Sequence, residues 1–250
     1  MSGGTNTSGT TVPSERRVLA VLQPGYLPWL GYFDQANRSD IFVHYDDVQY
    51  DKHGWRNRNR VKSTQGEPHW LSVPVLHSGK DWPRVVDVEI DQRSSWSRKH
   101  LGTLQQFYGK APFFKAYYPE IESVLLTPFA KLVDLDLALT EKLFALLGLK
   151  RRTQRSSTLG VPGEKTERLI ALCQRFEATH YLTGDAARDY LDIAAFTRIG
   201  VKVVWQEYQH PEYPQGPLAF VPYLSIVDLL LNCGPESLRV LAAGGRPIEN

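Results

Sequence analysis

The feature that most constrains this chain is the alternation of short runs rich in β-branched and aromatic residues with longer stretches of helical periodicity. The expected strands are Val18–Leu22, Ile41–Tyr45, Trp70–Val75, Val85–Ile90, Tyr181–Thr183 and Val201–Trp205. The expected helices are Leu30–Asn37, Trp96–Tyr108, Phe114–Leu126, Phe129–Leu147, Lys165–Phe176, Ala186–Ile199 and Ser225–Leu231. This order predicts an α/β fold: a Rossmann-like, mainly parallel sheet with a small β insertion at 70–90 and a helical segment at 96–147.

The length of 250 residues, 42% of them hydrophobic, fits one substantial core. We therefore expect a single α/β domain over residues 16–236 and a C-terminal tail over 237–250. Residues 1–15 are rich in Gly, Ser and Thr and lack the basic and apolar regions of a secretory signal. They are expected to form a disordered tail, and removal of residues 1–14 should leave folding and activity unchanged.

The charge balance points to a small, roughly neutral partner. Lys and Arg number 29 against 27 Asp and Glu, a net charge of +2, which is not typical of proteins that bind nucleic acid or anionic membranes. Cys173 and Cys233 are the only cysteines and form no metal-binding spacing, so we expect neither a disulfide, a metal nor another cofactor. The apolar stretches 137–149 and 224–231 are short and interrupted. The chain is therefore expected to be a soluble, cytoplasmic protein.

The first candidate site segment follows the first expected strand, in an aromatic and proline-rich loop over residues 23–32. Ligands of open α/β sheets collect at the carboxyl ends of strands, so this loop is expected to form a pocket wall. Gln23 would hold a polar substrate group, with Tyr26 and Trp29 beside it. The alternative is that the aromatic side chains are core residues that fix a rigid corner.

A polar connection over residues 45–62 follows the second expected strand. Arginine forks suit carboxylates or phosphates, and a carboxylate accepts a proton or orients an ammonium group. The alternative is a solvated basic loop with surface ion pairs. The candidate site residues of this segment are Asp46, Asp47, Trp55, Arg58, Asn59 and Lys62.

Two further candidate segments lie late in the chain. Thr183 and Gly184 end a strand before an expected helix, where free backbone N–H groups attract an anion unless Asp185 caps them. Gln215 lies in a loop after the last strand. Because each follows a strand of the proposed sheet, five residues are predicted to line one pocket: Gln23, Asp47, Arg58, Asn59 and Gln215.

Proton transfer is assigned to a histidine and a carboxylate chosen from His100, His210, Asp47 and Asp228. His100 is the first choice, because it shares a helix face with Trp96, which would fix its rotamer. His210 precedes Pro211 in a loop, and the alternative is that it only shapes this turn and has no catalytic role. Ser225 and Asp228 also fit the start of a helix as cap and N3 residue, without catalysis.

Several separated motifs occur together in order: Gln23-Pro24-x-Tyr26-x-Pro28-Trp29-x-Gly31-Tyr32, Asp46-Asp47-Val48-Gln49, Trp55-x-Asn57-Arg58-Asn59, Tyr213-x-Gln215, Ser225-x-x-Asp228 and Asn232-x-Gly234. They strongly resemble the WbqC-like family, from about residue 18 to 234. The resemblance implies a bacterial protein of surface-polysaccharide or specialised-metabolite assembly, where amines are acylated. It transfers no catalytic roles.

The leading hypothesis is a biosynthetic acyltransferase, with aminoacyl transfer included, that moves an acyl group from a thioester to an amine of a sugar or metabolite. A carrier protein is one possible holder of the thioester. The first alternative is a nucleotidyl-transfer or adenylating enzyme, although no P-loop is present. The second is a noncatalytic module that binds a sugar or a carrier protein.

Overall fold

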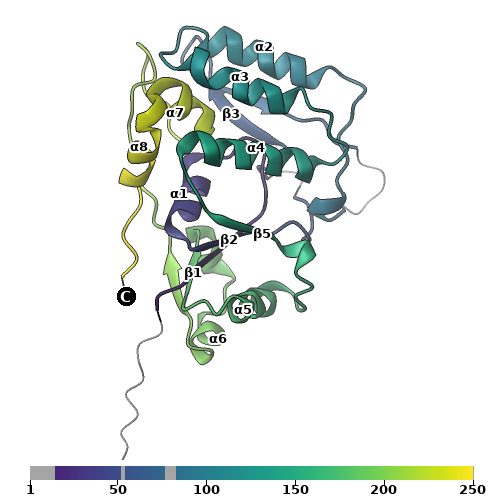
Figure 1. Ribbon diagram of the computed structural model, residues 1–250, viewed down its shortest axis with the longest axis vertical. Coiled ribbons are helices and arrows are strands. Elements are labelled where there is room, and N and C mark those ends of the chain that lie inside the picture. The colour runs from purple at the N-terminus through teal and green to yellow at the C-terminus, as the bar shows by residue number, and fades with distance from the viewer. Residues whose placement is uncertain (1–14, 52–53, 77–82, 250) are drawn as a thin grey trace, which may run out of the picture.

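The computed structural model describes residues 15–51, 54–76 and 83–249. Its main sheet has five parallel strands in the order β5-β2-β1-β6-β7 (Figure 1). The strands are β1 (Val18–Leu22), β2 (Ile41–His44), β5 (Arg152–Arg155), β6 (His180–Thr183) and β7 (Lys202–Trp205). The predicted α/β fold with a mainly parallel sheet is confirmed. The prediction for residues 1–14 lies outside the described residues.

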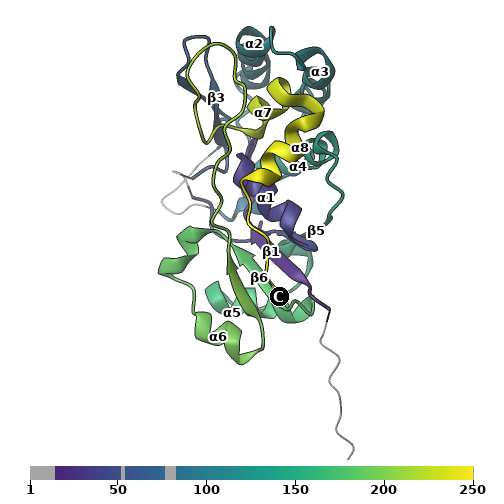
Figure 2. The same ribbon diagram turned by 90° about the vertical axis from the view of Figure 1, so that its left-hand side faces the viewer.

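Helices cover both faces of this sheet (Figures 1 and 2). Four lie on one side: α1 (Leu30–Arg38), α4 (Leu132–Leu147), α7 (Ile226–Cys233) and α8 (Ser237–Ala243). The other side carries α5 (Lys165–Arg175) and α6 (Ile193–Arg198). Strand β1 shows why two layers are needed: Ala20 joins the core with α1, and Leu19 and Val21 join the core with α5. Alternate side chains of a strand point to opposite faces, so both faces of β1 are apolar and buried.

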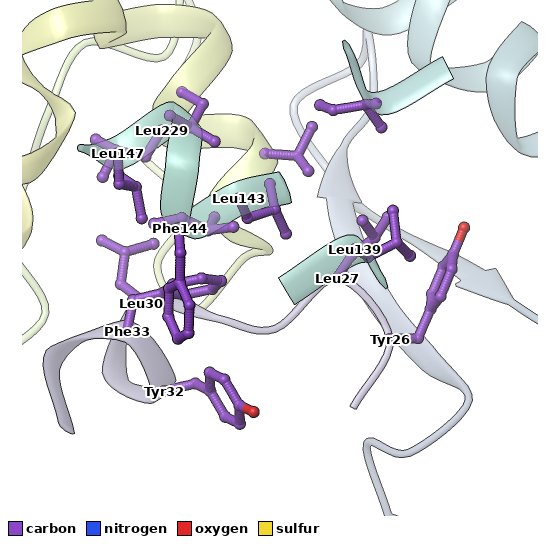
Figure 3. Packing of buried hydrophobic residues seen from close by; sticks show 14 of the residues in the cluster. Tyr26, Leu27, Leu30, Tyr32, Phe33, Leu139, Leu143, Phe144, Leu147 and Leu229 are labelled. Atoms are coloured by element: carbon purple, nitrogen blue, oxygen red, sulfur yellow. The ribbon is translucent and has the colours of Figure 1, made fainter. Parts of the chain in front are cut away.

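The larger core lies between α1, α4 and α7 (Figure 3). Leu30 and Phe33 of α1 meet Phe144 of α4, and the Phe33 and Phe144 rings pack edge to face with centroids 5.5 Å apart. Leu229 of α7 completes this group. Burial of each such side chain stabilises the fold by about 1.5–3 kcal/mol. Tyr32 lies at the edge of the cluster, which leaves its hydroxyl for polar contacts.

The β insertion is a separate hairpin of β3 (Arg58–Lys62) and β4 (Pro68–Ser72). The expected strand at Val85–Ile90 is wrong, because residues 85–87 form a short 3₁₀ helix and only the isolated bridges of Glu89 with Lys131 and of Ile90 with Val75 are strand-like. The polar composition of β3 concealed it: Asn59 and Val61 are buried, whereas Arg58 and Arg60 are partly exposed. The candidate residues at 58–62 therefore lie on a strand and not on a solvated loop.

The helical segment consists of α2 (Trp96–Tyr108) and α3 (Phe114–Leu125), which pack beside α4 at the end of the molecule away from α5 and α6 (Figure 1). The expected helix at 186–199 is interrupted. Residues 185–189 form a 3₁₀ helix, and α6 begins anew where the Asp192 carboxylate accepts a hydrogen bond from Ala195 N at 3.1 Å. A fresh cap of this kind marks a helix start.

The segment 237–250 is not the tail that we expected. Helix α8 begins within it at Ser237 and contacts α1, with Leu241 fully buried. Two further 3₁₀ helices occupy residues 156–158 and 234–236. Within residues 15–51, 54–76 and 83–249, no helix has both the length and the apolar character needed to cross a membrane.

Candidate functional site

A cavity of about 410 Å³ opens at the carboxyl ends of β1, β2 and β6. Leu22, Tyr45 and Thr183, at or just beyond these strand ends, line it. The chain runs from β1 to β2 through α1 on one face and from β5 to β6 through α5 on the other. The crevice between β1 and β6 is thus the point where the direction of winding reverses. Open α/β sheets bind ligands at this position.

The loop after β1 forms one wall of the cavity and is held against the segment before β3. Tyr26 N donates to Arg56 O at 3.0 Å. A Cβ on Gly25 would lie 2.8 Å from the backbone oxygen of Trp55, so only glycine allows this close approach. Trp29 and Trp55 supply aromatic surface on this wall.

Three amide side chains line the cavity: Gln23, Gln35 and Asn59. Each carries one buried polar atom without a hydrogen-bond partner among the described residues, namely Gln23 Oε1, Gln35 Oε1 and Asn59 Nδ2. Their other contacts hold them in place, since Gln35 Nε2 donates to Gln206 Oε1 at 2.7 Å and Asn59 Oδ1 accepts from Arg60 N. Buried polar groups are normally paired, so three unpaired amide atoms on one cavity wall mark it as a candidate ligand-binding surface.

Two cationic residues line the same cavity, and no Asp or Glu is among the described lining residues. Arg56 donates to the backbone oxygens of Gln23 and Pro24 at 3.0 and 3.2 Å, which fixes its guanidinium group beside the first loop. Lys165 is the first residue of α5, where the helix dipole adds positive potential. The cavity therefore favours anionic groups and disfavours cations.

Tyr32 lines the cavity and is linked to a buried histidine. Its hydroxyl lies 3.1 Å from His44 Nδ1, and His44 is only 2% exposed at the end of β2. Burial lowers the pKa of His44 to about 4 and raises the pKa of Tyr32 well above its usual range. Both groups are therefore neutral near pH 7, and their contact links a residue that lines the cavity to a buried imidazole.

The comparisons with known proteins agree with one another. The WbqC-like protein family matches residues 23–240. The chain belongs to the WbqC-like protein family. It is 36% identical over 225 residues to the uncharacterized protein Rv1507c of Mycobacterium tuberculosis. The matched region covers 88% of this chain and 95% of that protein. No solved structure matches.

This WbqC-like chain brings only part of the predicted site together. The predicted residues that line the cavity are Gln23, Trp29, Trp55, Asn59, Thr183 and Gly184. The predicted single pocket of Gln23, Asp47, Arg58, Asn59 and Gln215 is wrong, because only Gln23 and Asn59 reach the cavity. Sequence reasoning missed other polar or aromatic lining residues: Tyr32, Gln35, Tyr45, Arg56, Lys165, Tyr181 and Tyr190. Tyr45 offered a signal, since it follows β2 just as Gln23 follows β1.

Asp46 and Asp47 anchor a neighbouring turn and do not line the cavity. Asp46 accepts hydrogen bonds from Ser157 N at 2.9 Å and from Arg155 Nε at 2.8 Å. Burial raises the pKa of Asp46, but these hydrogen bonds outweigh it and lower the pKa overall. Asp47 accepts from Ser156 Oγ and from Arg168 of α5. Both carboxylates are thus occupied in joining β2 to the segment after β5.

His100 does not occupy the position expected of a general base. It does not line the cavity, and its Nδ1 lies 2.9 Å from the hydroxyl of Tyr26, which is buried with Trp96 in an aromatic group. Burial lowers the pKa of His100 to about 4, against a smaller upward effect of a hydrogen bond with the Ser72 backbone. The ring therefore joins α2, the first loop and β4 as a neutral imidazole.

This environment predicts a pH effect on stability. The folded pKa of His100 is below its unfolded value, so the unfolded chain binds a proton that the folded chain does not between pH 6.5 and about 4. His100 thus makes the free energy of unfolding fall as pH falls through this window, by roughly 3 kcal/mol in total. Urea unfolding at several pH values should show a shallower fall for His100→Gln than for the wild-type protein. Parallel curves for the two proteins would contradict this assignment.

Asp228, Lys62 and Gln215 belong to a buried network away from the cavity. Asp228 is fully buried and accepts hydrogen bonds from Tyr108, Tyr213 and Gln215 at 2.7, 2.9 and 2.8 Å. Burial raises the pKa of Asp228, and the hydrogen bonds oppose that rise. Lys62 Nζ donates to the backbone oxygens of residues 215, 218 and 219. The network joins α7, α2 and β3 to the loop before α7.

Arg58 and His210 contact aromatic side chains and backbone oxygens outside the cavity. Arg58 lies over the Trp70 ring at 4.8 Å and donates to Gly54 O. His210 Nδ1 lies 3.0 Å from Pro211 O, and its ring packs among aromatic side chains that include Tyr213. None of the four predicted proton-transfer residues lines the cavity, and no hydrogen bond joins either histidine to either carboxylate among the described residues.

A larger hollow of about 540 Å³ lies at the opposite end of the sheet. Arg17, Ile41 and Arg152, at the amino ends of their strands, line it beside Glu177. Charged side chains in this hollow pair with each other at the surface: Arg17 and Glu177 form an ion pair at 2.7 Å. We place the functional site at the carboxyl ends, because strand topology and unpaired buried amides coincide there.

Proposed function

We propose that this WbqC-like protein is a cytoplasmic biosynthetic acyltransferase whose cavity holds an amine of a sugar or metabolite while a thioester delivers the acyl group. The observation that carries the proposal is a cavity lined by Arg56 and Lys165 and by no described carboxylate. An amine attacks only when neutral. Nearby positive charges lower the pKa of a bound ammonium group and so favour the attacking form.

The amide side chains support a hydroxyl-bearing acceptor. The unpaired Gln23 Oε1 and Gln35 Oε1 can each accept a hydrogen bond from a ligand, and the unpaired Asn59 Nδ2 can donate one. Hydroxyl groups satisfy both kinds of partner, so a sugar or a polyhydroxylated amine suits the site. Trp29 and Trp55 offer the apolar surface against which a sugar ring or an acyl chain packs.

The reaction needs one proton path and one source of positive charge. The amine nitrogen bonds to the thioester carbonyl carbon, the C–S bond breaks, and the thiolate leaves. In this proposal the amine proton passes through the Tyr32 hydroxyl to His44 and is returned to the departing sulfur. Arg56 and Lys165 stabilise the oxyanion that develops on the carbonyl oxygen.

A second candidate function rests on the same cations. Arg56 and the amino end of α5 at Lys165 also suit the phosphates of a nucleotide, which favours nucleotidyl transfer or adenylation. The third candidate function is a noncatalytic module that binds a sugar or a carrier protein through the amide side chains of the cavity.

One incubation separates these three functions. The purified protein is mixed with acyl thioesters, attached to a carrier protein or to a small thiol, and with amino sugars, with and without ATP. Mass spectrometry then measures the products. Acyl transfer without ATP supports the proposal, and pyrophosphate release with ATP supports nucleotidyl transfer. Binding of the amino sugar without any product indicates a binding module.

A further inference from the structure

A second hollow, of about 300 Å³, adjoins the cavity. It is lined by Trp29, Trp55, Arg60 and Tyr223, and it shares Trp29 and Trp55 with the cavity. Tyr223 adopts φ 58°, in the left-handed region that a tyrosine rarely occupies. Backbone of this kind concentrates at binding sites. A ligand that fills the cavity can therefore extend into this hollow along a shared aromatic wall.

Beside the hollow, aromatic rings and guanidinium groups lie together on the exposed face of the β3–β4 hairpin. Trp55 and Trp70 are 41% and 44% exposed, and their ring centroids are 5.1 Å apart at an angle of 33°. Arg60, the cross-strand partner of Trp70, lies 5.2 Å from the Trp55 ring and 5.6 Å from the Trp70 ring. Large side chains of this kind rarely stay exposed together without a ligand or partner.

Arg60 has donor capacity that the fold does not use. One terminal nitrogen donates to Tyr223 O at 3.2 Å, whereas Nε has no hydrogen-bond partner among the described residues. Arg60 thus presents a fixed positive charge beside two exposed indole rings. Aromatic surface for a flat ring and an arginine fork for a phosphate are the two requirements of nucleotide binding.

We propose that this hollow is a nucleotide subsite, in which the base stacks on Trp55 and Tyr223, Trp70 holds the Trp55 ring in place, and a phosphate binds Arg60. The role of this subsite rests on the proposed acyl transfer, because the nucleotide would belong to one of its two substrates. Two sources supply this chemistry. The donor is a coenzyme A-type thioester, whose adenosine phosphates occupy the subsite, or the acceptor is an amino sugar linked to a nucleoside diphosphate.

The test measures binding of adenosine 3′,5′-bisphosphate and of uridine 5′-diphosphate by isothermal titration calorimetry. Preference for the first identifies the donor, and preference for the second identifies the acceptor. Trp70→Ala should weaken the preferred nucleotide at least about tenfold. Arg60→Met should weaken the nucleotide more than the parent nucleoside, because only the nucleotide carries phosphate.

Trp205→Ala is the matched control, because Trp205 also carries an arginine, Arg188, at 4.3 Å but lines a different hollow, whereas Trp70 packs on the lining residue Trp55. It should leave nucleotide binding unchanged. Trp70→Phe keeps an aromatic face and should bind more tightly than Trp70→Ala, which separates stacking from a folding defect. Absence of binding by both nucleotides, or equal binding by wild type and Trp70→Ala, overturns the subsite. So does competition by free N-acetylglucosamine for the Trp70-dependent site.

The subsite and the proposed function fail separately. An N-acetylcysteamine thioester and a free amino sugar contain no nucleotide, so transfer between them tests acyltransferase chemistry alone. Nucleotide binding without such transfer retains the subsite and rejects the chemistry. Transfer without any nucleotide binding retains the chemistry and rejects the subsite.

Discussion

Replacement of Tyr32 by Phe is expected to lower kcat of acyl transfer by about 100-fold or more, the usual scale for a lost proton-transfer group. The Tyr32 hydroxyl is the only part that changes. It lies 3.1 Å from His44 Nδ1 and reaches the cavity, so its loss breaks the path between the substrate amine and the imidazole. KM of the amine should change little, because the amide side chains that hold the acceptor remain.

The ring of Tyr32 explains why this variant should stay folded. Tyr32 packs edge to face against Phe33 and Phe42 at centroid distances of 5.5 and 5.2 Å, and phenylalanine keeps both contacts. The melting temperature serves as the control for folding. If Tyr32→Phe turns over at the wild-type rate, the proton path runs elsewhere in the cavity.

The largest loss of stability is expected for Asp228→Ala, about 3–5 kcal/mol in the free energy of unfolding. Asp228 is fully buried and receives the hydroxyl groups of Tyr108 and Tyr213 and the amide of Gln215. Its removal leaves three buried donors without an acceptor and leaves the buried Lys62 without its nearby negative charge. Urea unfolding followed by circular dichroism measures the change.

An exposed carboxylate provides the matched control. Glu177 pairs with Arg17 at 2.7 Å, but its side chain is 82% exposed, so Glu177→Ala should cost no more than about 0.5 kcal/mol. Asp228→Asn keeps one acceptor oxygen and should fall between the two. A loss below about 1 kcal/mol for Asp228→Ala would show that the network does not hold α7 to α2 and β3.

Strands β1 and β2 of the parallel sheet were predictable because their residues are apolar on both faces, whereas the edge strand β5 was missed because its residues are polar. Leu19 and Ala20 point to opposite layers and are both fully buried, which produces a continuous hydrophobic run in the sequence. Strand β3 lacked this signal, since Arg58 and Arg60 alternate with Asn59 and Val61. Its partner β4 was expected to pair further along the chain, so the hairpin register could not be foreseen.

The predictable part of the site comprises Trp29, Trp55 and Asn59, which lie in aromatic or polar segments, and residues at the ends of strands. Gln23 and Thr183 were found in this way, because strand ends set the position of a pocket in an open sheet. Tyr32 comes from α1 and Lys165 from α5, and helical periodicity does not reveal which residues face a cavity. The partners of His100 and Asp228 are tyrosines distant in sequence, so the expected histidine–carboxylate pair required contacts that only the folded chain defines.

If the cavity at the carboxyl ends of β1, β2 and β6 is the functional site, a bulky thiol label placed in it should block the reaction. Ala186 is exposed and lines the cavity, whereas Ala194 is exposed on α6 and does not. The native Cys173 and Cys233 are both buried, and burial raises the pKa of Cys173 to about 12, so neither competes for a maleimide.

Ala186→Cys and Ala194→Cys are each labelled with a bulky maleimide, and acyl transfer is measured before and after labelling. The label at residue 186 should lower turnover at least about tenfold by filling the cavity, and the amine acceptor should slow the labelling. The label at residue 194 should have no effect. Full turnover by the labelled Ala186→Cys protein would contradict the claim.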